Sequence, residues 1–240
     1  MHTVTPSCSL ASTRRGCLAL LALLALTPSR GEDEAAAPQV TALLEDWAQR
    51  TKDLRALRVE FEQTKHLRLL RRPLQSRGVS LLKGKRLRMD VHNAAGELEL
   101  VLQWKPGEVR LYHPRLRRQE VYPLPEDAAP PETPFLVMGE DVRELPRRYR
   151  VTLEAGGGLE TLVLVPRAEG AQVTSLRLEF QERRLVAVEQ QDRSGGRVRM
   201  KITRWEQDPE LPDAALELEL PPGTEVVQAG AGAPSPEQAR

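Results

Sequence analysis

The sequence has little cysteine, almost no net charge and no apolar run of transmembrane length, and each of these shortages excludes a class of protein. Its two cysteines among 240 residues are Cys8 and Cys17, so no disulfide framework or thiolate metal site is expected in the body of the chain. The formal net charge is only +1, whereas duplex-binding proteins usually carry a strong positive excess, so no nucleic-acid partner is expected. With 40% hydrophobic and 29% charged residues, the composition is that of a soluble globular protein.

The motifs of common catalytic and metal sites are also missing. His66, His92 and His113 lie far apart and lack the spacing of metal ligands. There is no Gly-x-Ser-x-Gly, no phosphate-cradling glycine loop and no His-Glu-x-x-His. Carboxylates lie on the polar faces of the predicted strands, opposite arginines, a pattern typical of solvated cross-strand ion pairs. We therefore predict no enzymatic activity, no cofactor and no metal site.

An export signal is predicted at the N-terminus. Arg14 and Arg15 precede an apolar run over residues 17–26, which small and helix-breaking residues follow. This run is too short to span a bilayer core, which needs about 20 residues, but it suits a secretory signal. Cys17 stands at the start of the run rather than after it, so no lipid attachment is expected. Residues 1–31 are predicted to be a signal peptide, cleaved near residues 28–35 by general or twin-arginine export, that delivers the protein to the periplasm.

The rest of the chain changes from one helical pattern to many strand patterns. Residues 32–37 are predicted to be a linker, and Pro38 begins a predicted helix over 38–51 with one apolar stripe. A weaker helical pattern covers 133–145, and residues 228–240 are predicted to be a disordered tail. Elsewhere apolar and polar residues alternate in about a dozen short segments, joined by turns rich in Gly, Pro, Asn and Asp. These segments are 57–61, 78–82, 87–91, 98–104, 109–111, the stretch near 121, 149–153, 162–164, 176–180, 186–188, 198–202 and 216–220.

Strands with one apolar face need a curved sheet or a barrel to enclose that face. Because the turns are short, neighbouring strands should be antiparallel, and we predict one α+β domain over 38–227 that is predominantly antiparallel β. Several apolar residues occupy alternate positions along successive strands, so their side chains should point to one face of the sheet. These residues are Leu87, Met89, Leu100, Leu102 and Leu111. The residues expected to cover this face are Leu43, Leu44, Trp47, Phe135, Leu136 and Met138.

Eight short motifs occur along the chain in a specific order. They are VEFEQT (59–64), SRGVSL (76–81), KGKRLRM (83–89), GEVRLYHP (107–114), TPFL (133–136), LVLVPR (162–167), AVEQQD (187–192) and LPPGTEV (220–226). In this order, and after an export signal, they resemble the periplasmic outer-membrane lipoprotein carrier (LolA) family over residues 38–227.

The resemblance implies an incomplete antiparallel β-barrel whose concave apolar face is covered by helices. It also implies a monomeric periplasmic chaperone for acylated lipoproteins. Such a chaperone receives its cargo from an inner-membrane lipoprotein-releasing ABC transporter, shields the acyl chains and passes the cargo to an outer-membrane acceptor. The residues expected to line the lipid-binding cavity are Phe61, Leu87, Met89, Leu100, Leu102, Leu111, Phe135, Leu136 and Met138, with Leu43, Leu44 and Trp47 on the covering helix.

The chain departs from the family pattern in two places. Gly84 stands where many members carry a basic residue, so that residue's role is not transferred, and Leu87 and Met89 replace cavity aromatics. Two other functions fit the same barrel: a periplasmic regulator that senses lipids or lipoproteins, and a structural envelope protein filled by its own side chains. The basic and apolar segment 66–73 fits either a membrane contact or an ordinary hairpin rim.

Overall fold

The computed structural model describes residues 31–126 and 142–229, and within them the chain forms a single twelve-stranded sheet. The strands are β1 (Ala56–His66), β2 (Leu74–Lys83), β3 (Arg86–Asn93), β4 (Leu98–Lys105), β5 (Glu108–His113), β6 (Arg118–Pro123), β7 (Tyr149–Gly156), β8 (Leu159–Pro166), β9 (Val173–Gln181), β10 (Arg184–Asp192), β11 (Arg197–Gln207) and β12 (Glu225–Gln228).

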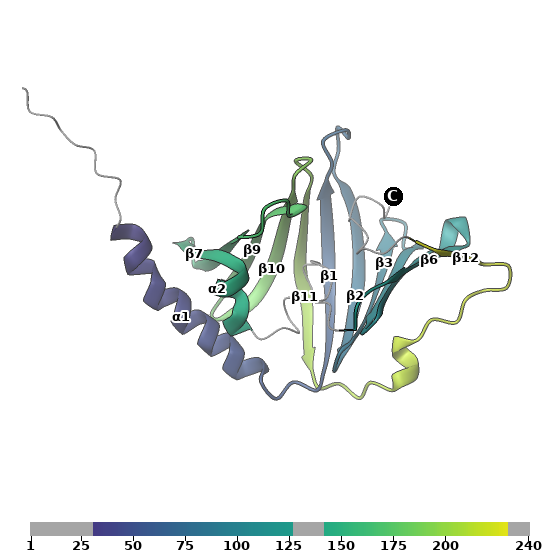
Figure 1. The fold of residues 1–240 in the computed structure, drawn as a ribbon, viewed down its shortest axis with the longest axis horizontal. Helices are drawn as coiled ribbons and strands as arrows, with labels where there is room; N and C mark the ends of the chain where they lie inside the picture. The colour runs from purple at the N-terminus through teal and green to yellow at the C-terminus, as the bar shows by residue number, and fades with distance from the viewer. Residues whose placement is uncertain (1–30, 127–141, 230–240) are drawn as a thin grey trace, which may run out of the picture.

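The strand order is β12-β6-β5-β4-β3-β2-β1-β11-β10-β9-β8-β7, and the sheet does not close on itself. Every pairing is antiparallel except that of β12, which lies parallel to β6. Figure 1 shows the sheet as a curved arch, with β7 near one edge and β12 at the other. The predicted fold class, an open and predominantly antiparallel sheet with few helices, is confirmed.

Helix α1 (Gly31–Thr51) begins seven residues before Pro38, so the prediction of a linker over 32–37 was wrong. The segment EDEAAA consists of acidic residues, which favour a helix N-terminus, and alanine, the strongest helix former. Pro38 is accommodated inside the helix although its ring removes one backbone donor. The apolar stripe of the helix is as predicted, because its four members are buried. They are Val40, Leu43, Leu44 and Trp47.

The other helical segments are short. Of the weak helical pattern predicted over 133–145, residues 133–141 lie outside the described residues. The remainder forms a 3-10 turn, η3 (Val142–Glu144), followed by the single-turn helix α2 (Leu145–Arg148). Further 3-10 turns are η1 (Pro114–Leu116) between β5 and β6, and η4 (Asp213–Leu216) after β11.

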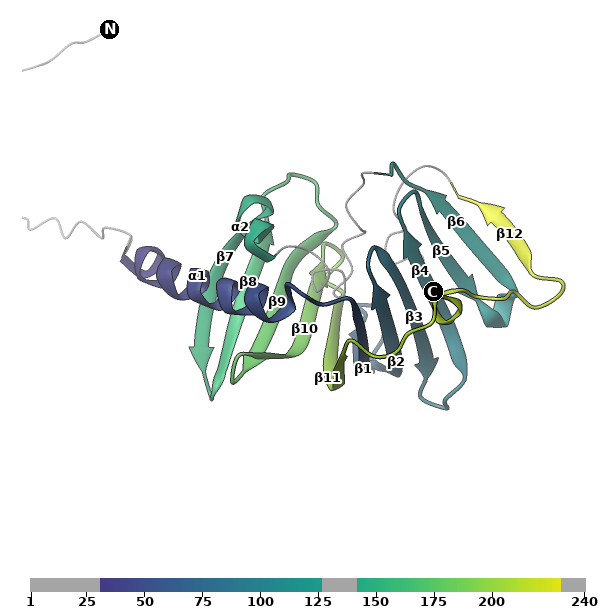
Figure 2. The ribbon, with the colours of Figure 1, turned by 90° about the horizontal axis from the view of Figure 1, so that it is seen from below.

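The C-terminal part of the chain differs from the prediction. The strand expected over 216–220 is not formed, and the twelfth strand lies instead at β12, which includes Gln228 from the predicted tail. Residues 217–220 pair with no strand of the described sheet, so the alternating leucines alone do not make a strand here. The segment instead crosses the polar face of the sheet before β12 adds to the edge strand β6, as Figure 2 shows from below.

Candidate functional site

The apolar face of the sheet is the candidate site, and the register of β3, β4 and β5 builds the part of it toward the β12 edge. Met89 pairs with Leu102, which pairs with Leu111, so the three side chains point to the same face. Leu87 pairs with Trp104 in the next row, and Leu100 pairs with Val91 in the row on the other side. The five strand residues predicted from their parity are therefore on one face, and all of them are buried. They are Leu87, Met89, Leu100, Leu102 and Leu111.

Phe61 continues this face onto β1. It is 1% exposed and lies directly opposite Gly78 of β2, so its ring occupies the space that a side chain at position 78 would need. A Cβ atom on Gly78 would lie 2.3 Å from Phe61 Cζ and 2.5 Å from the carbonyl oxygen of Asp90. Glycine is thus required at position 78 because the Phe61 ring and the Asp90 carbonyl lie so close to it, and not because of an unusual backbone angle.

Helix α1 covers the other half of the face. It packs chiefly against β7 and η3, and the Trp47 ring meets Phe180 of β9 edge-on with centroids 5.2 Å apart. Figure 2 shows α1 running across β7, β8 and β9. Leu43, Leu44 and Trp47 are buried in the same cluster as the β3–β5 residues, and α1 itself lies at the β7 end of the sheet, so their role as the cover of a lipid cavity stays a prediction. The other predicted covering residues, Phe135, Leu136 and Met138, lie outside the described residues.

Most of the other residues of this face, on β3–β5 and beyond, were not predicted as site residues. They belong to the same buried cluster and come mainly from β4 to β6 and from β8 to β11. They include Trp104, Val109, Tyr122, Leu162, Leu164, Leu176, Leu178, Phe180, Val188 and Met200. The alternation that identified Leu102 is present in each of these strands, so parity alone could have found them. Only the strand order shows that they form one continuous surface.

Polar side chains are buried within this apolar surface. Gln63 accepts a 2.9 Å hydrogen bond from Ser76 Oγ, and Gln190 is 4% exposed on β10. Ser80, opposite Met89, is 3% exposed, and its Oγ has no hydrogen-bond partner among the described residues. An unpaired hydroxyl in a dry, packed core costs about 1–3 kcal/mol. The Ser80 hydroxyl is therefore an unfavourable group on this face, because neither the apolar side chains around it nor an acyl chain can form a hydrogen bond with it.

Ionisable groups lie at the margins of the face. At the end of β1, burial lowers the pKa of the Lys65 ammonium, and Glu99 acts in the opposite direction. At the β5–β6 margin, burial also lowers the pKa of His113. Tyr122 donates a 2.8 Å hydrogen bond to Glu120, and burial together with this bond raises the pKa of the phenol to about 12. These groups are spread along the margin, and no group of three His, Cys, Asp or Glu that could hold a metal occurs in the described part of the chain.

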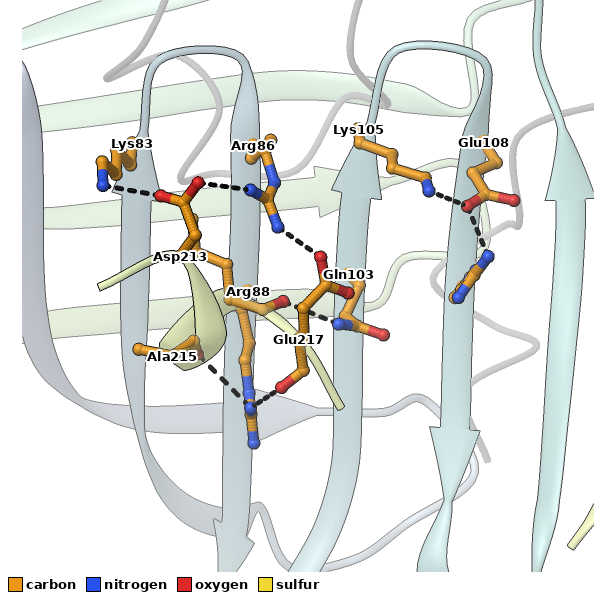
Figure 3. A network of polar contacts seen from close by, with 11 residues as sticks. Lys83, Arg86, Arg88, Gln103, Lys105, Glu108, Asp213, Ala215 and Glu217 are labelled. Carbon is orange, nitrogen blue, oxygen red and sulfur yellow. Dashed lines mark hydrogen bonds and ion pairs between the residues drawn. The ribbon is translucent and has the colours of Figure 1, made fainter. Parts of the chain in front are cut away.

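On the opposite, polar face of β2–β4, side chains of the sheet bind the C-terminal segment (Figure 3). Lys83 donates to the Leu211 carbonyl at 2.8 Å and to Asp213 at 2.6 Å. Three further side chains of the sheet bind this segment. Arg86 pairs with Glu217, Arg88 donates to the carbonyls of Ala215 and Glu217, and Gln103 donates to the Leu216 carbonyl at 2.7 Å. We call the segment 211–217 the C-terminal strap. Hydrogen bonds from side chains of the sheet, rather than the backbone hydrogen bonds of a strand, hold it in place.

A groove of about 350 Å³ also opens on the polar face, but its lining does not suit acyl chains. It lies over β11, β1, β2 and β3 and is lined mostly by charged and polar groups, among them Glu62, Arg77, Arg199 and Lys201. Arg199 already makes a bidentate ion pair with Glu179. The apolar face is consequently the better candidate for a hydrophobic ligand. None of the helices in residues 31–126 and 142–229 is long and apolar enough to cross a membrane.

Comparison with known proteins finds a matching family and several similar sequences. Residues 52–218 match the family described as outer membrane lipoprotein carrier protein LolA. The chain is 28% identical over 123 residues to an outer-membrane lipoprotein carrier protein of Chromohalobacter salexigens, covering 51% of this chain and 58% of that protein. It is 26% identical over 136 residues to a protein of the same name from Pseudomonas fluorescens, covering 57% and 64%. The matched part is thus about three fifths of the length of these curated relatives.

Solved structures with a similar chain path are more distant. A LolA superfamily protein from Nitrosomonas europaea has a TM-score of 0.43 and 12% identity, covering 74% of this chain and 97% of that chain. A conserved uncharacterized protein from Thermus thermophilus has a TM-score of 0.49 and 14% identity, covering 80% and 99%. The sequence match extends over well more than half of the residues, and on that basis the chain belongs to the outer membrane lipoprotein carrier protein LolA family.

Proposed function

We propose that the protein is a periplasmic carrier that shields the acyl chains of lipoproteins between the inner and the outer membrane. The observation that carries this proposal is the continuous apolar face of an open sheet, which runs from Tyr122 on β6 to Leu162 on β8. The curated relatives are named as outer-membrane lipoprotein carrier proteins, which supports the same role.

The physical requirement for such a carrier is a large apolar surface that releases its ligand. Each methylene group moved from water into an apolar site contributes about 0.8 kcal/mol, so an unshielded acyl chain is strongly disfavoured in the periplasm. A surface rich in leucine and methionine adapts to flexible chains without a rigid fit. The polar positions Ser80, Gln63 and Gln190 interrupt this surface and limit its affinity, which favours release.

The partners follow from the role. An inner-membrane lipoprotein-releasing ABC transporter would load the carrier, and an outer-membrane acceptor would unload it. The carrier itself needs no bond-making step. In this proposal Leu87, Met89, Leu100, Leu102, Leu111 and Phe61 contact acyl chains.

The test places a charge on the proposed surface. Met89→Glu should leave a protein that melts cooperatively but no longer binds a fluorescent triacylated lipopeptide or extracts a lipoprotein from inner-membrane vesicles. The matched control is Val163→Glu, which puts the same charge on the polar face of β8 opposite Arg177 and should bind normally. A carboxylate buried in a packed core would cost several kcal/mol and unfold the domain.

Two results would contradict the proposal. Global unfolding of Met89→Glu, with Val163→Glu intact, would indicate an interior filled by its own side chains, as in a structural envelope protein. Undiminished lipopeptide binding by a folded Met89→Glu protein would remove Met89 from the ligand surface. Titration with unacylated peptide provides the baseline for both variants.

A further inference from the structure

The hairpin that joins β1 to β2 exposes apolar side chains at its tip. Residues 67–73 form this connection, which we call the hairpin tip, and Figure 1 shows it projecting beyond the end of the sheet. Leu69 is 83% exposed and Leu70 is 45% exposed, and Leu74 at the start of β2 is 46% exposed. Single exposed leucines are ordinary on protein surfaces. Three within six residues on a projecting turn form a patch, and such patches mark interaction sites.

The same segment is strongly basic and contains no carboxylate. From residue 63 to residue 89 the sequence has nine lysines and arginines and no Asp or Glu, although the whole chain has a net charge of only +1. Arg68, Arg71 and Arg72 lie in the hairpin tip, and none of them makes an ion pair with a described residue. Arginines on the sheet behave differently, since Arg58, Arg177 and many others pair with a carboxylate on the same strand or on another strand of the sheet.

The neighbouring turn does not neutralise this charge. His66 pairs with Arg197, which places the β10–β11 turn beside the hairpin tip, and Arg68 Cδ lies within van der Waals reach of Gly195. Asp192 is the acid of that turn, but Arg193 follows it directly, so the two charges cancel and the turn carries no net negative charge. Figure 1 shows both turns projecting at the same end of the sheet. The positive charge of the tip is thus available to an external partner.

We propose that the hairpin tip docks on the surface of a bilayer containing anionic phospholipids, with Leu69 and Leu70 entering the interface and the arginines binding headgroups. Charge complementarity favours a lipid surface, because arginines flanking exposed leucines are the combination that interfacial segments use. A projecting turn also offers no groove that would shape a protein ligand. Since β1 carries Phe61 and Gln63 behind the tip, docking would bring that end of the apolar face to the membrane. The docking itself requires no cargo and does not depend on the carrier role.

The test measures binding of the purified, cargo-free protein to vesicles of phosphatidylcholine with or without one quarter phosphatidylglycerol. The protein should bind the anionic vesicles, and binding should fall as salt is raised from 50 to 300 mM because the headgroup attraction is screened. Leu69→Ser with Leu70→Ser should lower the partition coefficient at least tenfold. Arg71→Gln with Arg72→Gln should lower it by roughly 25-fold at low salt, at about fivefold for each arginine.

Matched controls lie elsewhere on the sheet. Val226→Ser removes an exposed apolar side chain from the edge strand β12, and Arg184→Gln removes an arginine from the β9–β10 turn at the opposite end. Both should bind anionic vesicles as the unmodified protein does. All substituted side chains are exposed or partly exposed, and circular dichroism melting curves confirm that each variant is folded.

A reporter at the tip tests insertion directly. In Leu69→Trp, the tryptophan emission should shift to shorter wavelength with anionic vesicles, and brominated lipid should quench it. The proposal is overturned if the unmodified protein does not bind anionic vesicles, if the controls lose as much binding as the tip variants, or if the Leu69→Trp emission is unchanged on binding. Each of these results would leave lipopeptide binding by the apolar face intact, so the two proposals fail separately.

Discussion

Replacing Gly78 by alanine tests how closely the strands pack behind the candidate site. The added Cβ would meet Phe61 Cζ at 2.3 Å, Phe61 Cε1 at 2.9 Å and the Asp90 carbonyl oxygen at 2.5 Å. The two Phe61 contacts involve the far end of a side chain, which can rotate. The contact with Asp90 involves the backbone of β3, which the sheet hydrogen bonds hold in place.

Two opposing effects determine whether Gly78→Ala raises or lowers the free energy of unfolding. Alanine reduces the conformational entropy of the unfolded chain and would stabilise the protein by about 0.4–1 kcal/mol if it fitted. Overpacking a buried site costs typically 1–3 kcal/mol, and here both a ring and a backbone oxygen must move. We therefore expect a net loss of about 2 kcal/mol in the free energy of unfolding. For a domain of this size the melting temperature should fall by about 4–8 °C.

Urea unfolding followed by circular dichroism measures this loss. The matched control is Gly156→Ala at the end of β7, where an added Cβ would have no neighbour within 4 Å and the backbone angle is ordinary. It should be neutral or slightly stabilising. In the background of Phe61→Leu, which removes the two ring atoms concerned, Gly78→Ala should cost about 1 kcal/mol less, because only the Asp90 contact remains. A Gly78→Ala protein as stable as the parent would show that the β1–β2–β3 packing described above is incorrect.

Three further predictions concern the strap and the acid response. Leu216→Ala should destabilise the protein by about 2 kcal/mol by opening a cavity under the C-terminal strap, and an unchanged urea midpoint would show that the strap is dispensable. The hydrogen bond from Lys83 holds the pKa of Asp213 below its usual value. The stabilisation by this ion pair is therefore present above about pH 4 and is lost as the pH falls through the pKa of the folded state. Amide exchange over 211–217, corrected for intrinsic rates, should rise at pH 3 more than it does in Asp213→Asn. Burial lowers the pKa of His113, so the unfolded state binds the imidazole proton at a higher pH than the folded state does. The free energy of unfolding should therefore decline from pH 7 to pH 5. His113→Gln should reduce that decline, and a pH profile identical to the parent's would contradict this prediction.

Local patterns in the sequence determined the strands and the faces of their side chains. Alternation of apolar and polar residues predicted β1 to β11 because each strand has one buried and one polar side, and a period of two is a property of the strand alone. The parity of Met89, Leu102 and Leu111 was sufficient to place them on one face for the same reason. The apolar stripe of α1 was equally local, since Leu43 and Trp47 recur with the helical period.

Tertiary structure decided which elements meet. The strand order brings β1 beside β11, although about 130 residues separate them, and no local pattern encodes that pairing. It also directs α1 to β7 and η3. It gives residues 211–217 side-chain partners on β2, β3 and β4, whereas the alternating leucines of 216–220 predicted a strand. The exposure of Leu69 was likewise undetermined by sequence, because a leucine is buried or exposed according to what packs against it. These features depend on contacts between residues distant in the chain, whose energies arise only when the whole sheet has formed.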